Sequence, residues 1–473
     1  MPHETLFQTS PPCENRWALA SLPLSLMKHE AASGASPRSR LLSFAGWAFV
    51  LALLVRLGLV AMVLATEKSV SPAEMFWTAD TERYLHLADS LLRGEFAIAG
   101  RPEIYRLPGY PLLLSPGVAM GWPTVWALVI QTFVCGLLSV AVVYLGQILD
   151  LDDRALRMSG LLCAVEPTLL LWSVQLMADS LLALSVAGAL VALFLHVRDQ
   201  DPRMLALATV FSVASAYVKP AAYGFAVVVV ICAFAGIRSK ERKRLQWTLL
   251  VVSSSALLLG AWHARNWQRA GFSGFSTQIS QANRSADFAV WRADNARASA
   301  DEIDRERNRR AIRNPTATDQ PLVLRSPVES RIWVHVNGIV RVVTNPGVMT
   351  WLPMLDLDAS GYASHRELAR LGPLGFLWQS ATDRPFLVAG SIVLGGLNLA
   401  YWSLFILGLK RIIRKAPYFA LAVLLTIGYF LLVSGGPWGQ SRFRIPFVAP
   451  FCAVAGAAFE RRHRLISPEA TEA

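Results

Sequence analysis

Long apolar runs alternate with short polar segments along most of this chain. Runs of about 18 or more apolar residues are typical of helices that span a bilayer. Such runs, the fifth and sixth of them short, are Leu41–Ala65, Thr124–Leu149, Leu156–Leu176, Ala178–His196, Met204–Val218, Ala221–Ile237, Trp247–Ala264, Pro385–Leu409, Tyr418–Ser434 and Ile445–Phe459. The pattern predicts an all-α polytopic membrane protein with about ten transmembrane helices.

The composition and the distribution of charge agree with a membrane protein and indicate its topology. Of 473 residues, 54% are hydrophobic and only 16% are charged, which is outside the range of soluble domains. Lys and Arg gather in alternate connections, as expected for loops on the cytoplasmic side. These clusters are Arg38–Arg40, Arg154–Arg157, Arg198–Arg203, Arg238–Arg244, Lys410–Lys415 and Arg461–Arg464. The net charge of +12 therefore reflects topology and does not favour nucleic-acid binding.

The same pattern predicts the organisation of the chain in a bacterial-type inner membrane, with both termini cytoplasmic. Residues 1–40 are rich in Ser, Pro and Ala and predict a disordered cytoplasmic leader. Residues 41–459 form the membrane domain and residues 460–473 a cytoplasmic tail. Two long polar segments, residues 66–110 and 265–384, are predicted on the outer face.

Each outer segment is predicted to carry an interfacial helix. From Asp80 to Arg93, helical spacing places Tyr84, Leu87, Leu91 and Leu92 on one stripe. We expect that stripe to lie in lipid, with the carboxylates facing the protein. A second apolar stripe runs from Ile332 to Val343.

Polar residues with catalytic potential also fall on the predicted outer side. Asp80 is the favoured candidate for a general base that activates an acceptor hydroxyl, and the alternative is a helix N-cap or a surface charge. Glu82 follows two residues later and would point away from Asp80 on a helix. Asp179, at the start of the fourth run, is expected to cap that helix or to bind an acceptor or a metal ion.

Four cations are candidates for binding a phosphate. Lys219 lies in a very short connection, where it either snorkels to the interface or meets an anion. Arg442 and Arg444 offer guanidinium groups to phosphate oxygens, or anchor the chain at the interface. Arg106 is expected to pair with a loop carboxylate or to reach the phosphate.

One carboxylate stands apart inside a predicted span. Glu166 precedes Pro167 in the third run, which predicts a kinked helix and a structural hydrogen bond. The histidines show no zinc-ligand spacing, so no metal site is predicted, and a divalent cation is left open as a cofactor.

Several motifs in order resemble the GT-C superfamily of membrane glycosyltransferases, in the branch of protein O-mannosyltransferases and aminoarabinose transferases. They are Asp80 in an acidic first outer loop, the Tyr84 to Gly94 helix, Arg106-Leu107-Pro108-Gly109-Tyr110-Pro111, Asp179, Lys219-Pro220, Arg265-Asn266-Trp267 and Arg442-Phe443-Arg444 with Pro446 and Pro450. The chain departs from many relatives by having Asp80-Thr81-Glu82 where they have adjacent Asp-Glu, and Asp179 where they have Glu.

The resemblance implies a GT-C-type fold and inverting transfer of a sugar from a polyprenyl-phosphate donor to a glycan, lipid or protein acceptor. It implies Asp80 as the base, with Glu82 beside it. Lys219, Arg442, Arg444 and Arg106 would bind the donor phosphate, and Asp179, Tyr105, Arg265 and Asn266 would have acceptor-binding or structural roles. Two alternatives stay open: a transporter or flippase for a polyprenyl-linked glycan, and a catalytically silent scaffold in envelope assembly.

Overall fold

A computed structural model describes residues 37–66, 71–236, 241–278, 288–291, 302, 327–355, 357, 379, 381–436 and 439–461. Most of the predicted leader, much of the segment 265–384 and nearly all of the tail lie outside these residues. The chain divides into two units, Met1–Ser43 and Phe44–Ala473, and the arrangement described below concerns the second.

The spanning helices follow the apolar runs closely. Seven helices of the described chain are long and apolar enough to cross a membrane, and a bent pair makes an eighth. Two shorter apolar helices, Pro202–Val218 and Pro220–Gly236, lie at the fifth and sixth predicted runs. Together these segments comprise α1 (Pro37–Leu64), α4 (Pro123–Ile148), α5 (Asp153–Val165) with α6 (Pro167–Ser173), α7 (Asp179–Asp199), α8 (Pro202–Val218), η3 (Pro220–Ala222) with α9 (Phe225–Gly236), α10 (Glu241–Ala270), α16 (Pro385–Lys415), α17 (Pro417–Ser434), and η4 (Ser441–Phe447) with α18 (Val448–Gly456) and η5 (Ala457–Phe459). The prediction of an all-α polytopic membrane protein is confirmed.

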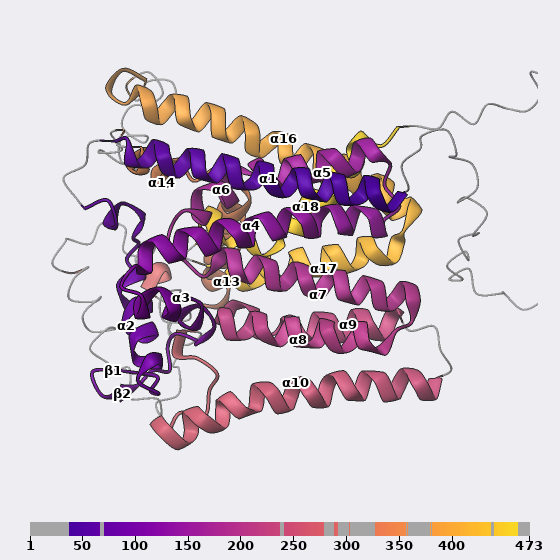
Figure 1. Cartoon of the computed structure of the whole chain (residues 1–473), viewed down its shortest axis with the longest axis horizontal. Helices are drawn as coiled ribbons and strands as arrows, with labels where there is room; N and C mark the ends of the chain where they lie inside the picture. The colour runs from indigo at the N-terminus through magenta and orange to yellow at the C-terminus, as the bar shows by residue number, and fades with distance from the viewer. Residues whose placement is uncertain are drawn as a thin grey trace, which may run out of the picture. The chain divides into compact units, whose positions relative to one another are not determined.

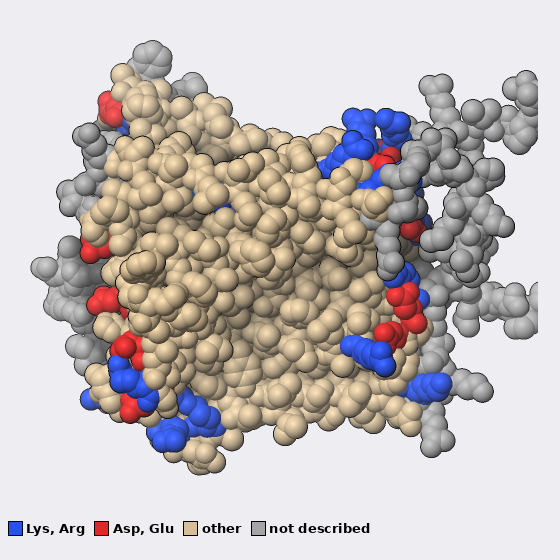
Figure 2. All heavy atoms as spheres, in the orientation of Figure 1, with Lys and Arg blue, Asp and Glu red and all other residues tan. Residues whose placement is uncertain are grey.

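The long helices run side by side as a bundle (Figure 1), with α7 packed against both α4 and α8. Figure 2 shows Lys, Arg, Asp and Glu gathered at the two ends of the bundle, with a broad uncharged band between them. Burying a charge in hydrocarbon is costly, so an uncharged band of this kind suits a lipid environment. The chain is a multi-pass membrane protein.

Shorter elements gather at one end of the bundle, which we call the α2 end (Figure 1). They include η2 (Glu74–Phe76), α2 (Thr81–Leu92), α3 (Gly109–Ala119) and a small antiparallel hairpin of β1 (Ala97–Ile98) and β2 (Arg101–Pro102). Gly100, with φ of 73°, closes the hairpin turn in the left-handed region that glycine adopts without strain. Two further helices, α13 (Val328–Thr344) and α14 (Val348–Met354), belong to the segment between α10 and α16.

The orientation expected for the helix after Asp80 is wrong. Tyr84 and Leu87 are buried inside the protein, where α2 packs against α3, and the ring of Tyr84 meets that of Tyr110 edge to face at 4.9 Å. Glu82 instead faces outward with 79% of its side chain exposed. The first part of the apolar stripe, Tyr84 and Leu87, therefore packs inside the protein, whereas Leu92 at its end is 49% exposed.

The predicted kink at Glu166 and Pro167 is confirmed. The helix axis bends by 45° between α5 and α6. At the bend, Glu166 Oε2 accepts a hydrogen bond from the Leu169 amide at 2.5 Å. The freed carbonyl groups of α5 also find donors, because Tyr401 Oη donates to the Leu162 carbonyl at 2.8 Å and Arg56 Nη1 to the Ala164 carbonyl at 3.1 Å. Backbone groups at membrane depth need such partners, since lipid supplies none.

Candidate active site

Asp80 forms an ion pair with Arg106 at the start of α2. Arg106 Nη2 donates to Asp80 Oδ1, and Asp80 makes no side-chain cap to its helix. The guanidinium of Arg106 also lies over the rings of Tyr105, at 4.8 Å, and Tyr84, at 5.2 Å. Asp80 keeps 25% of its side chain exposed, so a ligand at the surface can reach this carboxylate while Arg106 holds its orientation.

Asp179 forms a second pair, with Lys219, which is more deeply buried. Asp179 is the first residue of α7 and Lys219 follows the last residue of α8, so the antiparallel packing of these two helices brings the charges to the same end. Lys219 Nζ donates to Asp179 Oδ1 at 2.6 Å, and the Asp179 side chain is 0% exposed. Burial lowers the pKa of Lys219, while Asp179 opposes that shift. Lys219 therefore does not snorkel.

Arg442 is the third cation of this region and has no carboxylate partner within the described chain. Its guanidinium lies over the ring of Trp172 at 5.4 Å and that of Phe443 at 5.2 Å. Lys219 Nζ lies over the same Phe443 ring at 5.3 Å. The Nε atom of Arg442 is buried and makes no hydrogen bond. Arg442 thus differs from Arg106 and Lys219 in having no carboxylate partner among the described residues, and it keeps hydrogen-bonding capacity for a ligand.

The electrostatics of Tyr84 show that the two ion pairs and Arg442 form one cluster. Burial raises the pKa of Tyr84 to about 12; the charges of Arg106 and Arg442 oppose this rise, and those of Asp80 and Asp179 add to it. The same charges act on Lys219: Arg442 and Arg106 lower its pKa, in addition to the effect of its burial. Two cations and two carboxylates therefore act on the Tyr84 phenol, and Lys219 joins them through its ion pair with Asp179. The cluster carries one positive charge that its own carboxylates leave unbalanced.

Glu82 does not join the cluster. Its carboxylate is exposed and lies 3.6 Å from His86 Nε2, one helical turn along α2. Arg444 is also directed elsewhere. It is 5% exposed, its Nη1 donates to Asn398 and to the Val343 carbonyl at 2.9 Å, and its Nη2 donates to Thr168 Oγ1 at 2.5 Å.

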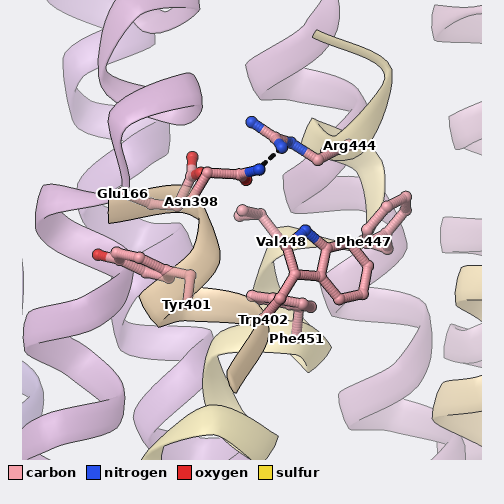
Figure 3. A pocket seen from close by; sticks show the side chains of 8 residues that line it. All are labelled: Glu166, Asn398, Tyr401, Trp402, Arg444, Phe447, Val448 and Phe451. Atoms are coloured by element: carbon pink, nitrogen blue, oxygen red, sulfur yellow. Dashed lines mark hydrogen bonds between the residues drawn. The ribbon is translucent and has the colours of Figure 1, made fainter. Parts of the chain in front are cut away.

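Figure 3 shows Arg444 beside a small cavity whose walls include Glu166, Asn398 and Tyr401. The hydrogen-bond partners of Arg444 belong to three different helices: Val343 to α13, Asn398 to α16 and Thr168 to α6. This placement makes Arg444 an anchor for η4, the short helix that also carries Arg442.

Two of the remaining predicted residues, Arg265 and Asn266, hold backbone segments beside the end of α10. Arg265 donates to the Glu103 carbonyl at 2.6 Å and to the Phe96 carbonyl at 2.8 Å, which ties α10 to the hairpin. Asn266 is buried and donates to the carbonyls of Gly274, at 3.0 Å, and Phe275, at 3.1 Å. Tyr105 is the exception, because its half-buried ring lies beside Arg106 at the edge of the cluster.

The sequence pattern missed two residues that shape this cluster. Glu103 Oε1 accepts the backbone amides of Tyr105 at 2.6 Å and Arg106 at 2.8 Å, and its Oε2 pairs with Arg83 Nη2 at 2.6 Å. Its spacing three residues before Arg106 was the available signal. Trp172 is one of fifteen tryptophans, and nothing in the sequence singles it out as the ring beneath Arg442.

A hard cation such as Mg²⁺ or Ca²⁺ is held by several oxygen ligands. In the cluster, Arg106 pairs with one oxygen of Asp80 and Lys219 with one oxygen of Asp179, and the buried Oδ2 of Asp179 makes no hydrogen bond with the described residues. Over the ranges that the structure describes, no group of three His, Cys, Asp or Glu side chains is placed to hold a metal ion.

No protein-family model matches the sequence, and no curated protein sequence matches it. Two solved structures of the oligosaccharyltransferase AglB from Archaeoglobus fulgidus do share its architecture, one in complex with an inhibitory peptide and a dolichol-phosphate, the other in the apo form. Each has a TM-score of 0.50 and 16% sequence identity, over 88% of this chain and 50% of AglB. The fold is of the GT-C type. The chain spans about half the length of AglB.

Proposed function

We propose that this protein is a glycosyltransferase that moves a sugar from a polyprenyl-phosphate donor to a glycan, lipid or protein acceptor. The observation that carries the proposal is the cluster of two ion pairs around Arg442, the cation without a carboxylate partner. AglB has been captured with a dolichol-phosphate and an inhibitory peptide, which supports a lipid phosphate and a separate acceptor on a related fold. The motif order favours the O-mannosyltransferase and aminoarabinose-transferase branch.

Arg442 receives the donor phosphate in this proposal, and Lys219 stands beside it. A phosphodiester donor carries one negative charge, which equals the positive charge that the cluster leaves unbalanced. Guanidinium groups bind phosphate oxygens through paired hydrogen bonds, and Trp172 and Phe443 hold the plane of Arg442 in place. Arg106 contributes through its field, since its hydrogen bonds go to Asp80 and Tyr84. Arg444 contributes by anchoring η4.

Asp80 acts as the general base. It takes the proton of the acceptor hydroxyl, whose oxygen forms a bond to the anomeric carbon of the sugar. The bond between that carbon and the phosphate oxygen breaks, and the lipid phosphate leaves with both electrons. Attack from the face opposite the phosphate inverts the configuration. A correctly placed base typically contributes about 10²–10⁴-fold to such a step.

The test is sugar transfer by purified protein in proteoliposomes, with a labelled polyprenyl-phosphate sugar as donor. Asp80→Asn should lower kcat by roughly 10²–10⁴-fold, whereas Glu82→Gln, two residues away, should leave kcat unchanged. Arg442→Ala should raise the donor KM by about tenfold or more, because a charge-assisted hydrogen bond of roughly 1.5–3 kcal/mol is lost. Arg93→Ala, which breaks only an exposed pair with Asp89, is the matched control.

Equal transfer by the wild type and Asp80→Asn would show that Asp80 is not the base. Absence of transfer from every polyprenyl-phosphate donor would reject the enzyme in favour of a transporter for polyprenyl-linked glycans, or of a scaffold.

A further inference from the structure

A short connection between α6 and α7 links the two halves of the cluster. Residues 174–178 are not helical, and Asp179 follows immediately. Within the connection, the Leu176 amide donates to the Phe76 carbonyl at 3.0 Å, and Thr81 Oγ1 donates to the Leu176 carbonyl at 3.3 Å. Thr81 is the neighbour of Asp80. The connection is therefore bonded to the Asp80 side at Leu176 and carries Asp179 at its end.

Gln131 of α4 holds this connection from the other side. Its Nε2 donates to the carbonyls of Ser173 and Gln175, both at 2.9 Å. Its Oε1 accepts from Tyr110 Oη at 2.5 Å and from the Met177 amide at 3.4 Å. A glutamine amide offers two donors and two acceptor sites, so this side chain, only 1% exposed, is fully used.

The partners of Gln131 reach both ion pairs. Tyr110 meets Tyr84 edge to face, and the Tyr84 hydroxyl accepts from Arg106 Nη1 at 3.4 Å, beside Asp80. In the other direction, Met177 stands two residues before Asp179. Irregular backbone in a membrane protein must find hydrogen-bond partners within the protein, because hydrocarbon offers none. Without the amide of Gln131, the Ser173 and Gln175 carbonyls would lose these hydrogen-bond donors. The backbone of residues 174–178 would then shift.

We infer that Gln131 is a positioning residue that fixes the distance between the Asp80–Arg106 pair and the Asp179–Lys219 pair. It lies behind the cluster and touches neither donor nor acceptor. This inference rests on the proposed function, in which Asp80 serves the acceptor and Lys219 stands beside the donor phosphate. Transfer requires the acceptor at Asp80 and the donor phosphate near Lys219 to be correctly placed relative to each other. A displacement of one ion pair relative to the other therefore slows the chemical step, while each ligand still binds.

Gln131→Met keeps the length of the side chain and removes all of its hydrogen bonds. We expect kcat to fall roughly 10- to 100-fold, because a displacement of about 1 Å can cost as much as 10²-fold. The donor KM should stay within about twofold, since the phosphate site at Arg442 is not touched. Ser139→Ala is the matched control: Ser139 is also buried on α4, but its hydrogen bonds go to the Cys135 carbonyl and to Cys163 of α5, away from residues 174–178, and its loss should change neither constant.

Backbone hydrogen exchange supplies a readout that does not depend on activity. Peptides covering residues 174–178 should exchange about tenfold faster or more in Gln131→Met and at the wild-type rate in Ser139→Ala. Tyr110→Phe removes a single bond to Gln131 and should lower kcat less. Combined with Gln131→Met, it should add almost nothing, because both changes remove the same contact. This milder variant keeps the test available if Gln131→Met fails to fold.

Unchanged exchange in the connection would overturn the inference, as would a raised donor KM with an unchanged kcat. A wild type that transfers sugar, together with a Gln131→Met variant of equal kcat, would overturn the positioning role alone. A wild type that transfers nothing would overturn the proposed function, and the positioning role would fall with it.

Discussion

At the scale of single residues, the cluster is defined by which charges are already paired. A buried ion pair gains little over an apolar pair, but removing one partner costs about 3–5 kcal/mol because the other charge is left unbalanced. Asp179 and Lys219 are in this position, whereas Asp80 remains partly exposed. The second pair therefore keeps a fixed geometry, and Asp80 keeps a face on which a substrate can bind.

The pH dependence of transfer follows from the burial of Lys219. Burial lowers its pKa from 10.5, and Asp179 opposes this shift. Because the charged ammonium beside the phosphate disappears as pH rises through this lowered pKa, kcat/KM should decline at a pH below 10.5. In Asp179→Asn the opposing charge is gone and the pKa falls further. The alkaline limb of the pH–rate profile should then move to lower pH.

The measurement is kcat/KM against pH at fixed ionic strength, with Glu82→Gln as the control that keeps the wild-type limb. A limb that stays in place or moves to higher pH in Asp179→Asn would show that Lys219 is not the titrating group.

Sequence reasoning reached Asp80, Lys219 and Arg106 because isolated charges beside long apolar runs need partners. It did not separate Arg442 from Arg444. The two stand two residues apart, and only the packing of η4 decides that one lies over Trp172 while the other reaches Asn398. Gln131 gave no signal at all, since a single amide in an apolar run does not reveal which irregular backbone it will meet.

At the scale of helices, the pattern of apolar runs was sufficient to predict the long apolar helices of the described residues, because length and hydropathy are local properties. The faces of α2 were not predictable in the same way. Its apolar stripe suits lipid or a protein neighbour equally well, and α3 turned out to be that neighbour. The 45° bend between α5 and α6 was predictable from Glu166-Pro167. The side chains that bond to the backbone at this bend, Arg56 of α1 and Tyr401 of α16, are distant in sequence and were not predictable.

Close packing of α13 against the chain ahead of η4 gives a prediction at this scale. A Cβ added to Gly338 would overlap the backbone of Gly436. Overpacking of this kind typically costs about 1–3 kcal/mol, so Gly338→Ala should lower the melting temperature in detergent. Because the displaced segment leads to Arg442, the donor KM should also rise.

Gly395→Ala on α16 is the matched control for that experiment. Nothing lies within 4 Å of a Cβ added there, and alanine favours a helix over glycine by about 1 kcal/mol. Its melting temperature should equal or exceed that of the wild type. A Gly338→Ala variant as stable as Gly395→Ala would contradict close packing at Gly338.

At the scale of the whole molecule, the charge distribution gives a prediction of the side of the membrane on which the cluster lies. The distribution of Lys and Arg predicts that the α2 end is outside and that the far end of α16 is cytoplasmic. Arg101 in the hairpin and Arg414 near the end of α16 are both exposed. In a Cys13→Ser background, Arg101→Cys should react with a membrane-impermeant maleimide in intact cells, and Arg414→Cys only after the cells are opened. The reverse labelling pattern would invert the topology and place the cluster in the cytoplasm.

The pairing of Asp179 with Lys219 has a consequence for how the chain enters the bilayer. Each residue stands at the open end of the α7–α8 hairpin, and neither helix on its own carries a partner for its charge. A carboxylate and an ammonium are cheaper to desolvate together than apart. Membrane insertion of α7 is therefore energetically linked to that of α8, and the pair that organises the cluster also ties the biogenesis of these two helices together.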